Sequence, residues 1–535
     1  MPSHRIRARD ARGDTASAVW KLDDDIVASY LTDAARVPGG HAKGVAAPAS
    51  EAAVASLLRS TRHVLAIGAQ SSLTGGATPR GETILTTARM NAIVAIAADS
   101  VRVQAGVTLD ALDQALAAAG RSYPPVPTFT GAFVGGIVAT NAAGAATFKY
   151  GSTRDWVTAL TVVLPGGRVL DLERGSTVAH PDGYFEIDLG EKTVRVPIPT
   201  YRMPDVSKIS AGYFAAPGMD LIDLFIGSEG TLGVVTEATL RVLRARPAVC
   251  RAFVPFHDKA SAFDVVSRLR AEADTAWSSG GSRGIDVSAI EHIDARGLAV
   301  IREDGMDNAC GVRLSESTKM ALIVALDLPP GTTPEAAFHQ IGRAGEADAP
   351  DTGLVRFCAL LAGCGVLDDV EIAVPGDSSR LSQLAAIREA VPAGVNQRIT
   401  AAQHDVDRRI EKTAGDLLVR PADVEAFAGM CEDEFRDRGL DFAVWGHVSD
   451  GNLHPNVIPH SWSDVEAGRD ALFALGREAI RLGGVPLAEH GVGRNTIKQR
   501  LLLELYGNEG VEQMREVKRA IDPDWKLSPG VIFPP

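Results

Sequence analysis

Three glycine-rich segments in the first half of the chain constrain its fold most, because glycine lets the backbone approach other groups closely. The first segment, residues 68–77, directly follows an apolar run that favours a β-strand. Its small residues would let successive backbone N–H groups converge on a pyrophosphate, with the hydroxyls of Ser71 and Ser72 as further donors. It has neither the G-x-G-x-x-G pattern of a nicotinamide-binding fold nor the Gly-Lys-Ser/Thr of a P-loop. Taken alone, the segment indicates either a phosphate-binding loop or a tight turn.

Two further segments favour ligand binding over simple turns. Residues 130–144 are rich in Gly, Ala and Thr, a composition that suits backbone lying against a large flat group. Residues 227–237 read Gly-Ser-Glu-Gly-Thr-Leu-Gly and then a β-branched run, as expected of a turn that leads into a strand. Three unrelated glycine turns in an ordinary α/β domain are the alternative interpretation.

In this order and spacing, the three segments resemble the FAD domain of the vanillyl-alcohol oxidase/p-cresol methylhydroxylase (PCMH) superfamily over roughly residues 40–246. The resemblance implies that FAD is held by the loop at 68–77 and by segment 130–144, with Val235 near the adenine. The residues that it marks as FAD contacts are Gly68, Ala69, Gln70, Ser71, Ser72, Leu73, Gly75, Thr130, Gly131, Gly135, Thr140, Gly144, Glu229, Gly233, Val235 and Asn452.

The periodicity of the sequence predicts an α+β chain built of several parts. Residues 1–44 form an N-terminal segment, and residues 45–246 alternate short strands with Ala-rich helical stretches, as in a PCMH-type FAD-binding domain. Within this domain, residues 175–219 form a polar insertion with several prolines, which we expect to cross a cleft rather than join the core. Residues 247–480 predict helices on a mainly antiparallel sheet, and residues 481–535 predict a helical tail that completes the active site.

Turn chemistry between residues 442 and 457 predicts a metal site, because Asp-Gly is a strong two-residue hairpin signal. A single histidine in a strand is more often a structural residue. Directly opposed residues of a hairpin, however, have Cβ atoms roughly 5 Å apart on one face, so two opposed imidazoles can chelate one cation. The turn at Asp450-Gly451 would pair Ser449 with Asn452, Val448 with Leu453, His447 with His454 and Trp445 with Asn456.

A third metal ligand and a base are candidates in the sequence Ala-Glu-His-Gly-Val-Gly near the end of the chain. Glu489 would supply the carboxylate, and the adjacent His490 could serve as a base. Two histidines and one carboxylate leave coordination positions for water or substrate, as expected of a catalytic rather than a structural metal. Zinc and manganese both suit this set of ligands.

The Gly-His-x-x-Asp-Gly-Asn-Leu-His and Glu-His-Gly-Val-Gly elements resemble the substrate domain of D-lactate and D-2-hydroxyglutarate dehydrogenases over about residues 250–530. The expected architecture is therefore a PCMH-type FAD-binding domain followed by an FAD-linked oxidase C-terminal domain. The resemblance implies that His447, His454 and Glu489 hold the metal and that His490 is the general base.

The same resemblance marks Arg388, Lys412 and Asn456 as substrate contacts. An arginine suits this role because it can grip a carboxylate through two parallel hydrogen bonds. A solvated helix charge is the alternative interpretation of Arg388. Pro392 stands where the dicarboxylate enzymes offer a hydroxyl, which weakens 2-hydroxyglutarate as the substrate.

The expected activity is FAD- and metal-dependent oxidation of a 2-hydroxy acid to the 2-oxo acid by hydride transfer to flavin N5. The substrate would be D-configured and lactate-like or larger, and the external electron acceptor stays open. A flavin-dependent, non-redox transferase of the alkylglycerone-phosphate synthase type is the alternative, but that type relies on consecutive histidines and this chain has no His-His pair. An electron-transfer or scaffold subunit is a third interpretation, which the complete set of candidate ligands and base disfavours.

Composition argues against several other classes of protein. The 54 Lys and Arg against 67 Asp and Glu give a formal charge of −13, which provides no basic footprint for nucleic acid. Five widely spaced cysteines argue against a disulfide framework or an iron–sulfur cluster and suit a cytoplasmic location. Residues 122–148 are uncharged, but their Pro, Gly, Thr and Asn content predicts no transmembrane helix. Peripheral attachment to the inner membrane and a homodimer stay open.

Overall fold

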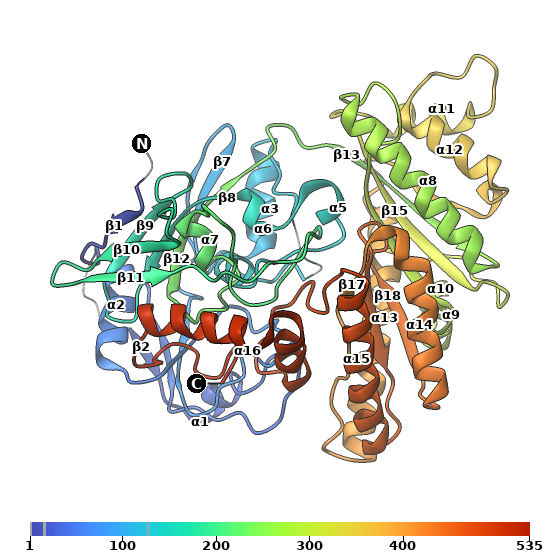
Figure 1. Cartoon of the computed structure of the whole chain (residues 1–535). Helices are drawn as coiled ribbons and strands as arrows, with labels where there is room; N and C mark the ends of the chain where they lie inside the picture. Colours follow the sequence, from blue (N-terminus) through green and yellow to red (C-terminus); the bar gives the residue numbers. More distant parts are fainter. Residues whose placement is uncertain (1–2, 14–17, 126, 128, 535) are drawn as a thin grey trace. The chain divides into compact units, whose positions relative to one another are not determined.

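The computed structural model describes residues 3–13, 18–125, 127 and 129–534 (Figure 1). The chain forms two compact units. The first unit comprises residues 1–144, 151–244 and 485–535, and the second comprises residues 145–150 and 245–484. The chain therefore passes between the units four times, and the short segment 145–150 belongs to the second unit although its neighbours in sequence belong to the first.

In the described part of the chain, the first unit contains three β-sheets. Their strand orders are β2-β3-β5-β4, β6-β7-β12-β8-β9 and β1-β10-β11, and the five-stranded sheet is antiparallel throughout. The strands are β1 (Arg5–Arg7), β2 (Val19–Lys21), β3 (Val45–Ala47), β4 (Val64–Ile67), β5 (Thr83–Thr86), β6 (Ile93–Ile96), β7 (Ser100–Gln104), β8 (Val157–Val163), β9 (Val169–Glu173), β10 (Tyr184–Asp188), β11 (Thr193–Pro197) and β12 (Val234–Arg241). The helices are α1 (Asp24–Ala28), α2 (Glu51–Ser60), α3 (Leu109–Ala118), α4 (Val134–Ala139), α6 (Thr153–Trp156), α7 (Leu221–Phe225) and α16 (Thr496–Ile521).

Capping residues explain where the helices of this unit begin and end. The side chain of Ser50 accepts a hydrogen bond from Ala53 N at the start of α2, and Thr108 caps α3 in the same way. Gly120, at φ +67°, follows the end of α3. The predicted alternation of short strands with helical stretches is found here in the strands β4 to β7, the helix α3 and the antiparallel pair β8 and β9.

Segment 175–219 belongs to the core of the first unit, so the expectation that it lies outside the core is wrong. Its strands β10 and β11 pair with each other, and β10 also pairs with β1 from the N-terminal segment. Phe185 and Val196 are fully buried, and the fully buried Tyr213 bonds to Thr231 through its hydroxyl over 2.7 Å. The polar composition concealed this role because inward and outward side chains alternate along both strands.

The second unit is built on one seven-stranded sheet with the order β16-β13-β15-β14-β18-β19-β17, in which all neighbours are antiparallel. The mainly antiparallel sheet that the sequence predicts is thus confirmed. The strands are β13 (Ala248–Phe256), β14 (Val287–Asp294), β15 (Met320–Leu328), β16 (Glu371–Ala373), β17 (Leu417–Leu418), β18 (Phe442–Gly446) and β19 (Asn452–Val457). The helices are α5 (Thr147–Tyr150), α8 (Lys259–Ser278), α9 (Ala295–Glu303), α10 (Met306–Ala309), α11 (Pro334–Gly342), α12 (Gly353–Gly363), α13 (Ser378–Asp405), α14 (Val424–Asp437), α15 (Trp462–Arg481), η1 (Leu367–Asp369) and η2 (Pro421–Asp423).

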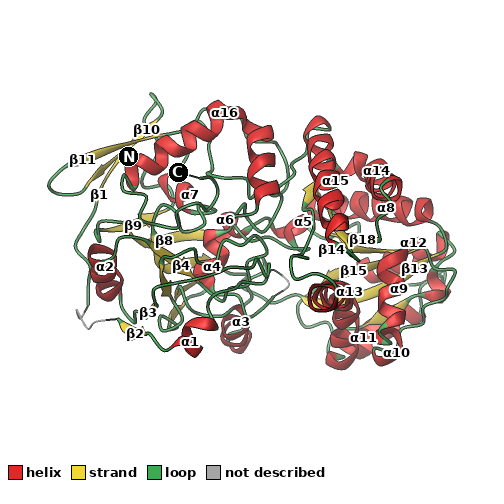
Figure 2. Ribbon diagram, turned by 90° about the horizontal axis from the view of Figure 1, so that it is seen from below, coloured by secondary structure: helices red, strands yellow, loops and turns green. Residues whose placement is uncertain are grey.

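Helices cover both faces of this sheet (Figure 2). Leu322 and Val324 of β15 face a core shared with α8, α14 and α15, whereas Ala321 and Ile323 face a second core shared with α9 and α13. Successive side chains of a strand point to opposite faces, so one apolar run can fill both cores. The sheet is therefore buried on both sides.

The C-terminal segment, residues 485–535, folds with the first unit. Its helix α16 is kinked at Gly507, which has a non-helical φ of 70°. The residues after α16 extend beside β4, where Val64 N donates to Lys526 O over 2.9 Å and Ser528 N donates to Val64 O over 2.8 Å. Leu527 between them is fully buried. The tail thus lies alongside β4, the strand that leads into the glycine-rich loop at 68–77.

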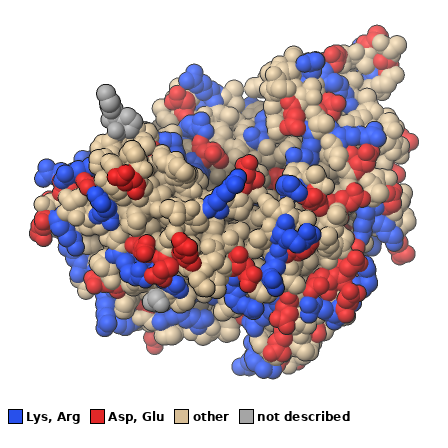
Figure 3. All heavy atoms as spheres, viewed as in Figure 1, with Lys and Arg blue, Asp and Glu red and all other residues tan. Residues whose placement is uncertain are grey.

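Among the described residues, none of the helices combines the length and the apolar character that a bilayer crossing requires. Basic and acidic side chains are interspersed over the face drawn in Figure 3. With this distribution, an anionic ligand would be attracted by local charges at its site rather than by the field of the whole face.

Candidate functional site

The three glycine-rich segments are far apart in sequence but lie against one another in the first unit. A Cβ atom added to Gly68 would lie 3.7 Å from Gly136 Cα, so the loop after β4 contacts α4. Glu229 N donates to Ala139 O over 2.7 Å, so the third segment contacts the end of the same helix. The small helix α4 is therefore the element on which the other two segments converge.

The N-terminal segment holds the loop at 68–77 in its conformation. Gln70 has φ 55°, in the left-handed region, and its Nε2 donates to Tyr30 O over 2.9 Å. The carboxylate of Asp33, only 5% exposed, accepts a hydrogen bond from Ala77 N over 3.1 Å. Burial raises the pKa of Asp33. Sequence reasoning missed Asp33, because it lies 44 residues before Ala77 and outside any recognisable pattern.

The space around two successive glycines of α4 differs, and the difference distinguishes a glycine required by packing from one that a ligand could contact. A Cβ atom at Gly135 would lie 2.8 Å from Ala105 Cβ, so packing requires this glycine. A Cβ atom at the next residue, Gly136, would meet no described atom within 4 Å. Residues 68–73 are all half-buried. Small, partly exposed backbone beside open space fits the approach of a flat phosphorylated cofactor, and Gly136 is a candidate contact that sequence reasoning missed.

The other predicted cofactor contacts in these segments have packing partners of their own. A Cβ atom at Gly233 would lie 2.4 Å from Val162 Cγ1, and one at Gly131 would lie 2.5 Å from a phenylalanine ring. The hydroxyl of Thr140 donates to the backbone within α4 over 3.1 Å. Their contacts with FAD stay predictions. The remaining predicted contacts in the same three segments are Ala69, Ser71, Ser72, Leu73, Gly75, Thr130, Gly144 and Val235.

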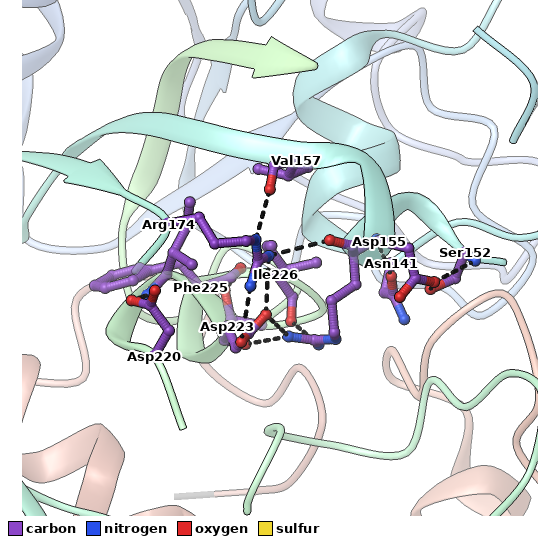
Figure 4. A network of polar contacts seen from close by, with 12 residues as sticks. Asn141, Ser152, Asp155, Val157, Arg174, Asp220, Asp223, Phe225 and Ile226 are labelled. Carbon is purple, nitrogen blue, oxygen red and sulfur yellow. Dashed lines mark hydrogen bonds and ion pairs between the residues drawn. The ribbon is translucent and has the colours of Figure 1, made fainter. Parts of the chain in front are cut away.

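A partly buried polar network fixes α4 relative to the turn at residue 227 (Figure 4). Arg154 N donates to Asn141 Oδ1 over 2.9 Å, just beyond the end of α4. The guanidinium of Arg154 contacts Asp223 Oδ1 at 3.0 Å and Ile226 O at 2.6 Å, both in or next to α7. Arg174 also reaches Asp223, over 3.1 Å. The network therefore holds two of the glycine-rich segments at a fixed separation.

The carboxylate of Glu229 binds the C-terminal segment. It accepts hydrogen bonds from Val492 N over 2.7 Å and Gly493 N over 2.8 Å, and Glu229 itself has φ 51°. Burial raises the pKa of Glu229 to about 7, although these two hydrogen bonds oppose the shift. Lys498 Nζ donates to Gly491 O over 3.2 Å. Glu229 and Lys498 together fix the backbone that carries the predicted ligand and base.

The predicted third ligand, Glu489, is buried, and its Oε1 lies 2.6 Å from Nζ of Lys208, whose side chain is fully buried. Lys208 comes from segment 175–219, and sequence reasoning gave it no role. His490 has φ 68°, a conformation that costs a residue with a side chain about 1–2 kcal/mol. Its Nε2 lies 3.8 Å from Glu489 Oε2. Strained backbone of this kind often occurs at functional sites.

In the second unit, the predicted register of the β18–β19 hairpin is wrong by two residues, and residues 447–449, which were predicted to pair, lie in the connection. Trp445 pairs with His454, whereas a two-residue turn would have placed Trp445 opposite Asn456. The connection is longer than that turn, and Asn452 N donates across it to His447 O over 3.1 Å. Because strand side chains alternate, a shift of two residues leaves each side chain on its original face.

The imidazole rings of the two histidines of this hairpin pack edge to face. The ring centroids of His447 and His454 lie 5.2 Å apart at an angle of 88°, and both residues are buried. A carboxylate lies beside Nδ1 of each ring, Glu291 Oε2 at 3.4 Å from His447 and Asp416 Oδ1 at 3.7 Å from His454. A carboxylate at one ring nitrogen favours the tautomer whose other nitrogen can bind a metal. This donor set fits a divalent cation.

Arg388 is buried, with its side chain 12% exposed, so the interpretation as a solvated helix charge is wrong. Its Nε donates to Glu291 Oε2 over 2.6 Å and its Nη1 to Glu389 Oε1 over 3.0 Å. Burial opposes ionisation of Glu291, but the charges of Arg388 and His447 outweigh it and hold its pKa well below the usual range. Sequence reasoning missed Glu291, which lies 97 residues before Arg388.

Several polar atoms near the two histidines fit a ligand. Within the described residues, Asn452 Oδ1, Asn456 Oδ1 and Ser449 Oγ are buried and have no hydrogen-bond partner, which is uncommon in folded proteins. Asn452 Nδ2 donates to Asp416 Oδ1 over 3.1 Å, and Asn456 Nδ2 donates to His454 O over 2.9 Å. The side-chain oxygens of both asparagines are therefore held in place.

The remaining predicted substrate contact, Lys412, lies in the same unit. Its Nζ donates to Asn396 Oδ1 over 3.0 Å, and Asn396 belongs to α13, the helix that also carries Arg388. The two predicted carboxylate-binding residues are thus both linked to one helix.

Two family models match the chain. The FAD binding domain matches residues 42–173, and the C-terminal domain of FAD linked oxidases matches residues 247–532. The D-lactate dehydrogenase of Archaeoglobus fulgidus is 27% identical over 470 residues, which cover 87% of this chain and 84% of that protein. The D-2-hydroxyglutarate dehydrogenase of Xanthomonas citri pv. viticola is 27% identical over 485 residues, which cover 88% of this chain and 84% of that protein.

Solved structures with the same fold are more distant in sequence. A 4-ethylphenol oxidase from Gulosibacter chungangensis matches with a TM-score of 0.63 and 15% identity, over 96% of this chain and 94% of its own. An alkyldihydroxyacetonephosphate synthase matches with a TM-score of 0.60 and 14% identity, over 95% of this chain and 82% of its own. The predicted PCMH-type FAD-binding domain followed by an FAD-linked oxidase C-terminal domain is confirmed. Since the match at 247–532 alone extends over more than half of the 535 residues, the chain belongs to the FAD-linked oxidases.

Proposed function

We propose that this protein oxidises a 2-hydroxy acid to the 2-oxo acid by hydride transfer to FAD, with a divalent metal ion at the substrate. The relatives that are named for D-lactate and D-2-hydroxyglutarate support a D-configured substrate, lactate-like or larger. The observation that carries the proposal is the pair of buried imidazoles, His447 and His454, with a carboxylate beside each. Two such imidazoles and one further carboxylate suit Zn²⁺ or Mn²⁺.

In this proposal His447 and His454 of the second unit and Glu489 of the first hold the metal. When bound, the metal supplies a Lewis acid that lowers the pKa of the substrate hydroxyl. The glycine-rich segments of the first unit hold FAD, which supplies the hydride acceptor when bound.

The remaining residues orient the substrate and move its proton. Arg388 and Lys412 bind the substrate carboxylate, and Asn456 contacts the substrate with its buried side-chain oxygen. Holding the carboxylate at two cations limits the rotation of the substrate and so directs its Cα–H bond. The imidazole of His490 accepts the hydroxyl proton, as a general base.

The replacement His490→Ala tests the base. This variant is expected to retain FAD, but the best 2-hydroxy acid should reduce the flavin at least about 100-fold more slowly than in the wild type. The substrate is first found by screening D- and L-2-hydroxy acids, aliphatic and aromatic, for anaerobic bleaching of the flavin. Stopped-flow absorbance then gives the rate. His404→Ala, at a histidine whose side chain is 87% exposed, is the matched control. An unchanged rate in His490→Ala would refute the role.

The metal is tested separately. Elemental analysis should find a transition metal in the wild type, and His447→Ala and His454→Ala should lose it. A chelator should slow flavin bleaching, and added Zn²⁺ or Mn²⁺ should restore it. Bound flavin without any metal, and without bleaching by any hydroxy acid, would instead favour the non-redox transferase, whose support so far is likeness of fold.

We also propose that the reduced flavin passes its electrons to an external acceptor. The five cysteines are dispersed and offer no grouped ligands for an iron–sulfur cluster. Free cysteines agree with a cytoplasmic location, which cell fractionation tests against attachment to the inner membrane. Light scattering on the purified protein tests whether it is a homodimer.

A further inference from the structure

We propose that Glu291 positions both the metal ligand His447 and the substrate-binding residue Arg388. One buried carboxylate would then couple the geometry of the metal to that of the substrate carboxylate. This inference rests on the proposed function, and all of its observations lie within the second unit.

The strand register brings Glu291 to His447. β14 pairs with β18 so that Ile293 opposes Trp445 and His292 opposes Gly446, and the next step places Glu291 opposite His447. Opposed residues of an antiparallel pair have Cβ atoms roughly 5 Å apart, so their side chains meet.

The fold brings Arg388 to Glu291 from another element. Ile293 lies two residues after Glu291, and therefore on the same face of β14, and it belongs to the core that also contains buried side chains of α13. Arg388 is part of α13. Sheet and helix thus deliver the two partners to one carboxylate.

Both partners contact the same oxygen atom. Arg388 Nε lies 2.6 Å from Glu291 Oε2, and His447 Nδ1 lies 3.4 Å from that oxygen. The side chains of all three residues are at most 15% exposed. Water competes little for such contacts, so the carboxylate restrains both partners.

The contact of Glu291 with His447 and its contact with Arg388 have different effects. A carboxylate at Nδ1 of His447 favours a proton on that atom and leaves Nε2 as the metal-binding atom. The bond to Nε of Arg388 restrains the plane of the guanidinium, and so the direction of the N–H groups that Glu291 and Glu389 do not use and that could bind a carboxylate. Loss of Glu291 should therefore weaken both metal binding and substrate binding.

The variant Glu291→Gln tests this inference, because it keeps the shape of the side chain and removes its charge. Mn²⁺ titration of the metal-stripped, FAD-containing protein, followed by electron paramagnetic resonance of free Mn²⁺, should give a Kd about 10–100-fold higher than in the wild type. At saturating Mn²⁺, KM for the hydroxy acid should rise on the order of 10-fold with little change in kcat, since a charged hydrogen bond in ground-state binding is disturbed.

Glu389→Gln is the matched control. Glu389 is the next residue along α13 and pairs with Nη1 of the same arginine, but its side chain is 48% exposed. This variant should bind Mn²⁺ as the wild type does. Two further variants separate positioning from folding. Glu291→Asp should bind Mn²⁺ with intermediate affinity. The double variant Glu291→Gln/Arg388→Met removes both buried charges, so it should regain thermal stability and still bind Mn²⁺ weakly.

The outcomes distinguish this inference from the proposed function. If the wild type binds Mn²⁺ and its flavin is bleached, but Glu291→Gln equals the wild type in Kd and KM, Glu291 does not position these residues and the inference alone is overturned. If the wild type binds no Mn²⁺, the proposed metal chemistry is overturned and the inference with it.

Discussion

Lys208 and Glu489 compensate each other's charge inside the first unit. Nζ of Lys208 lies 2.6 Å from Oε1 of Glu489, and the two side chains are 0% and 5% exposed. The desolvation of both charges makes such a pair a weak source of net stability, but removal of one partner leaves a buried charge without compensation. The predicted metal ligand therefore depends on a residue 281 positions earlier in the chain.

In the metal-stripped protein, replacing Lys208 by methionine should reduce the free energy of unfolding by on the order of 3 kcal/mol, because the buried carboxylate of Glu489 then loses its lysine partner. Adding Glu489→Gln in the same chain should recover part of this loss. Urea unfolding of the FAD-containing variants measures both effects. Lys259→Met, which breaks an ion pair with Glu432 at a lysine that is 41% exposed, should cost at most about 1 kcal/mol. Equal losses in the two lysine variants would contradict the buried-pair argument.

At this scale the sequence identifies residues that stand in a local pattern and misses those that only the fold brings together. His447, His454, Glu489 and His490 were predicted because each belongs to a short motif. Glu291 and Lys208 contact these motifs, and Asp33 contacts the glycine-rich loop at 68–77, but no spacing in the sequence marks any of the three. The backbone strain at His490 was also not predictable, because tertiary contacts impose its φ of 68°.

The β18–β19 hairpin shows how far a pattern can predict an element. The Asp-Gly turn signal predicted the hairpin and the shared face of the two histidines, and the contact between the two rings agrees with this. The register was wrong because the contacts of the connection, rather than the Asp-Gly pair, set its length. A Cβ atom at Gly451 would lie 2.1 Å from Val419 O, so the adjacent segment around Val419 shapes the turn.

Gly451→Ala should therefore destabilise the second unit and disturb the two histidines. Gly451 has φ +85°, and an added Cβ atom would collide with a backbone oxygen that cannot move easily. Gly439→Ala is the matched control, because Gly439 has φ +69° but an added Cβ atom there would meet nothing described within 4 Å. Thermal unfolding should show a loss of about 1 kcal/mol for Gly439→Ala, the strain of φ alone, and a clearly larger loss for Gly451→Ala.

Metal content distinguishes the two variants further. Gly451→Ala should retain less metal than the wild type after dialysis, whereas Gly439→Ala should retain as much. Equal stability losses in both variants would mean that the connection tolerates the added atom and that its contacts do not set the position of His447.

For the whole molecule, local patterns predicted the classes of structure but not the path of the chain. Alternating strands and helices predicted the α+β architecture, and the antiparallel sheet of the second unit followed from long helical patterns between isolated strands. No pattern in the sequence predicted that segment 145–150 belongs to the second unit while its sequence neighbours belong to the first. Its position is fixed by contacts such as those of Lys149 Nζ, which lies 2.8 Å from both Asp286 and Asp327.

The stability of the protein should also depend on pH through His292. This residue is 2% exposed, and its Nδ1 lies 3.3 Å from Gly446 O. Burial lowers the pKa of His292 to about 4. In the unfolded chain the pKa returns to about 6.5, so between these two values the unfolded state binds more protons than the folded state. The free energy of unfolding should therefore fall as the pH falls from about 6.5 to about 4, by at most about 3 kcal/mol from this residue.

His292→Asn isolates this contribution, because the asparagine keeps an N–H donor near Gly446 O and cannot be protonated in this range. Calorimetric Tm values measured between about pH 4 and pH 7 should decline less steeply for His292→Asn than for the wild type. The variant should start from a lower Tm at neutral pH, because the smaller side chain leaves a cavity. His404→Asn, at the 87% exposed histidine, should follow the wild-type slope. If His292→Asn declines as steeply as the wild type, the loss in acid arises from other groups and His292 does not stay neutral by burial.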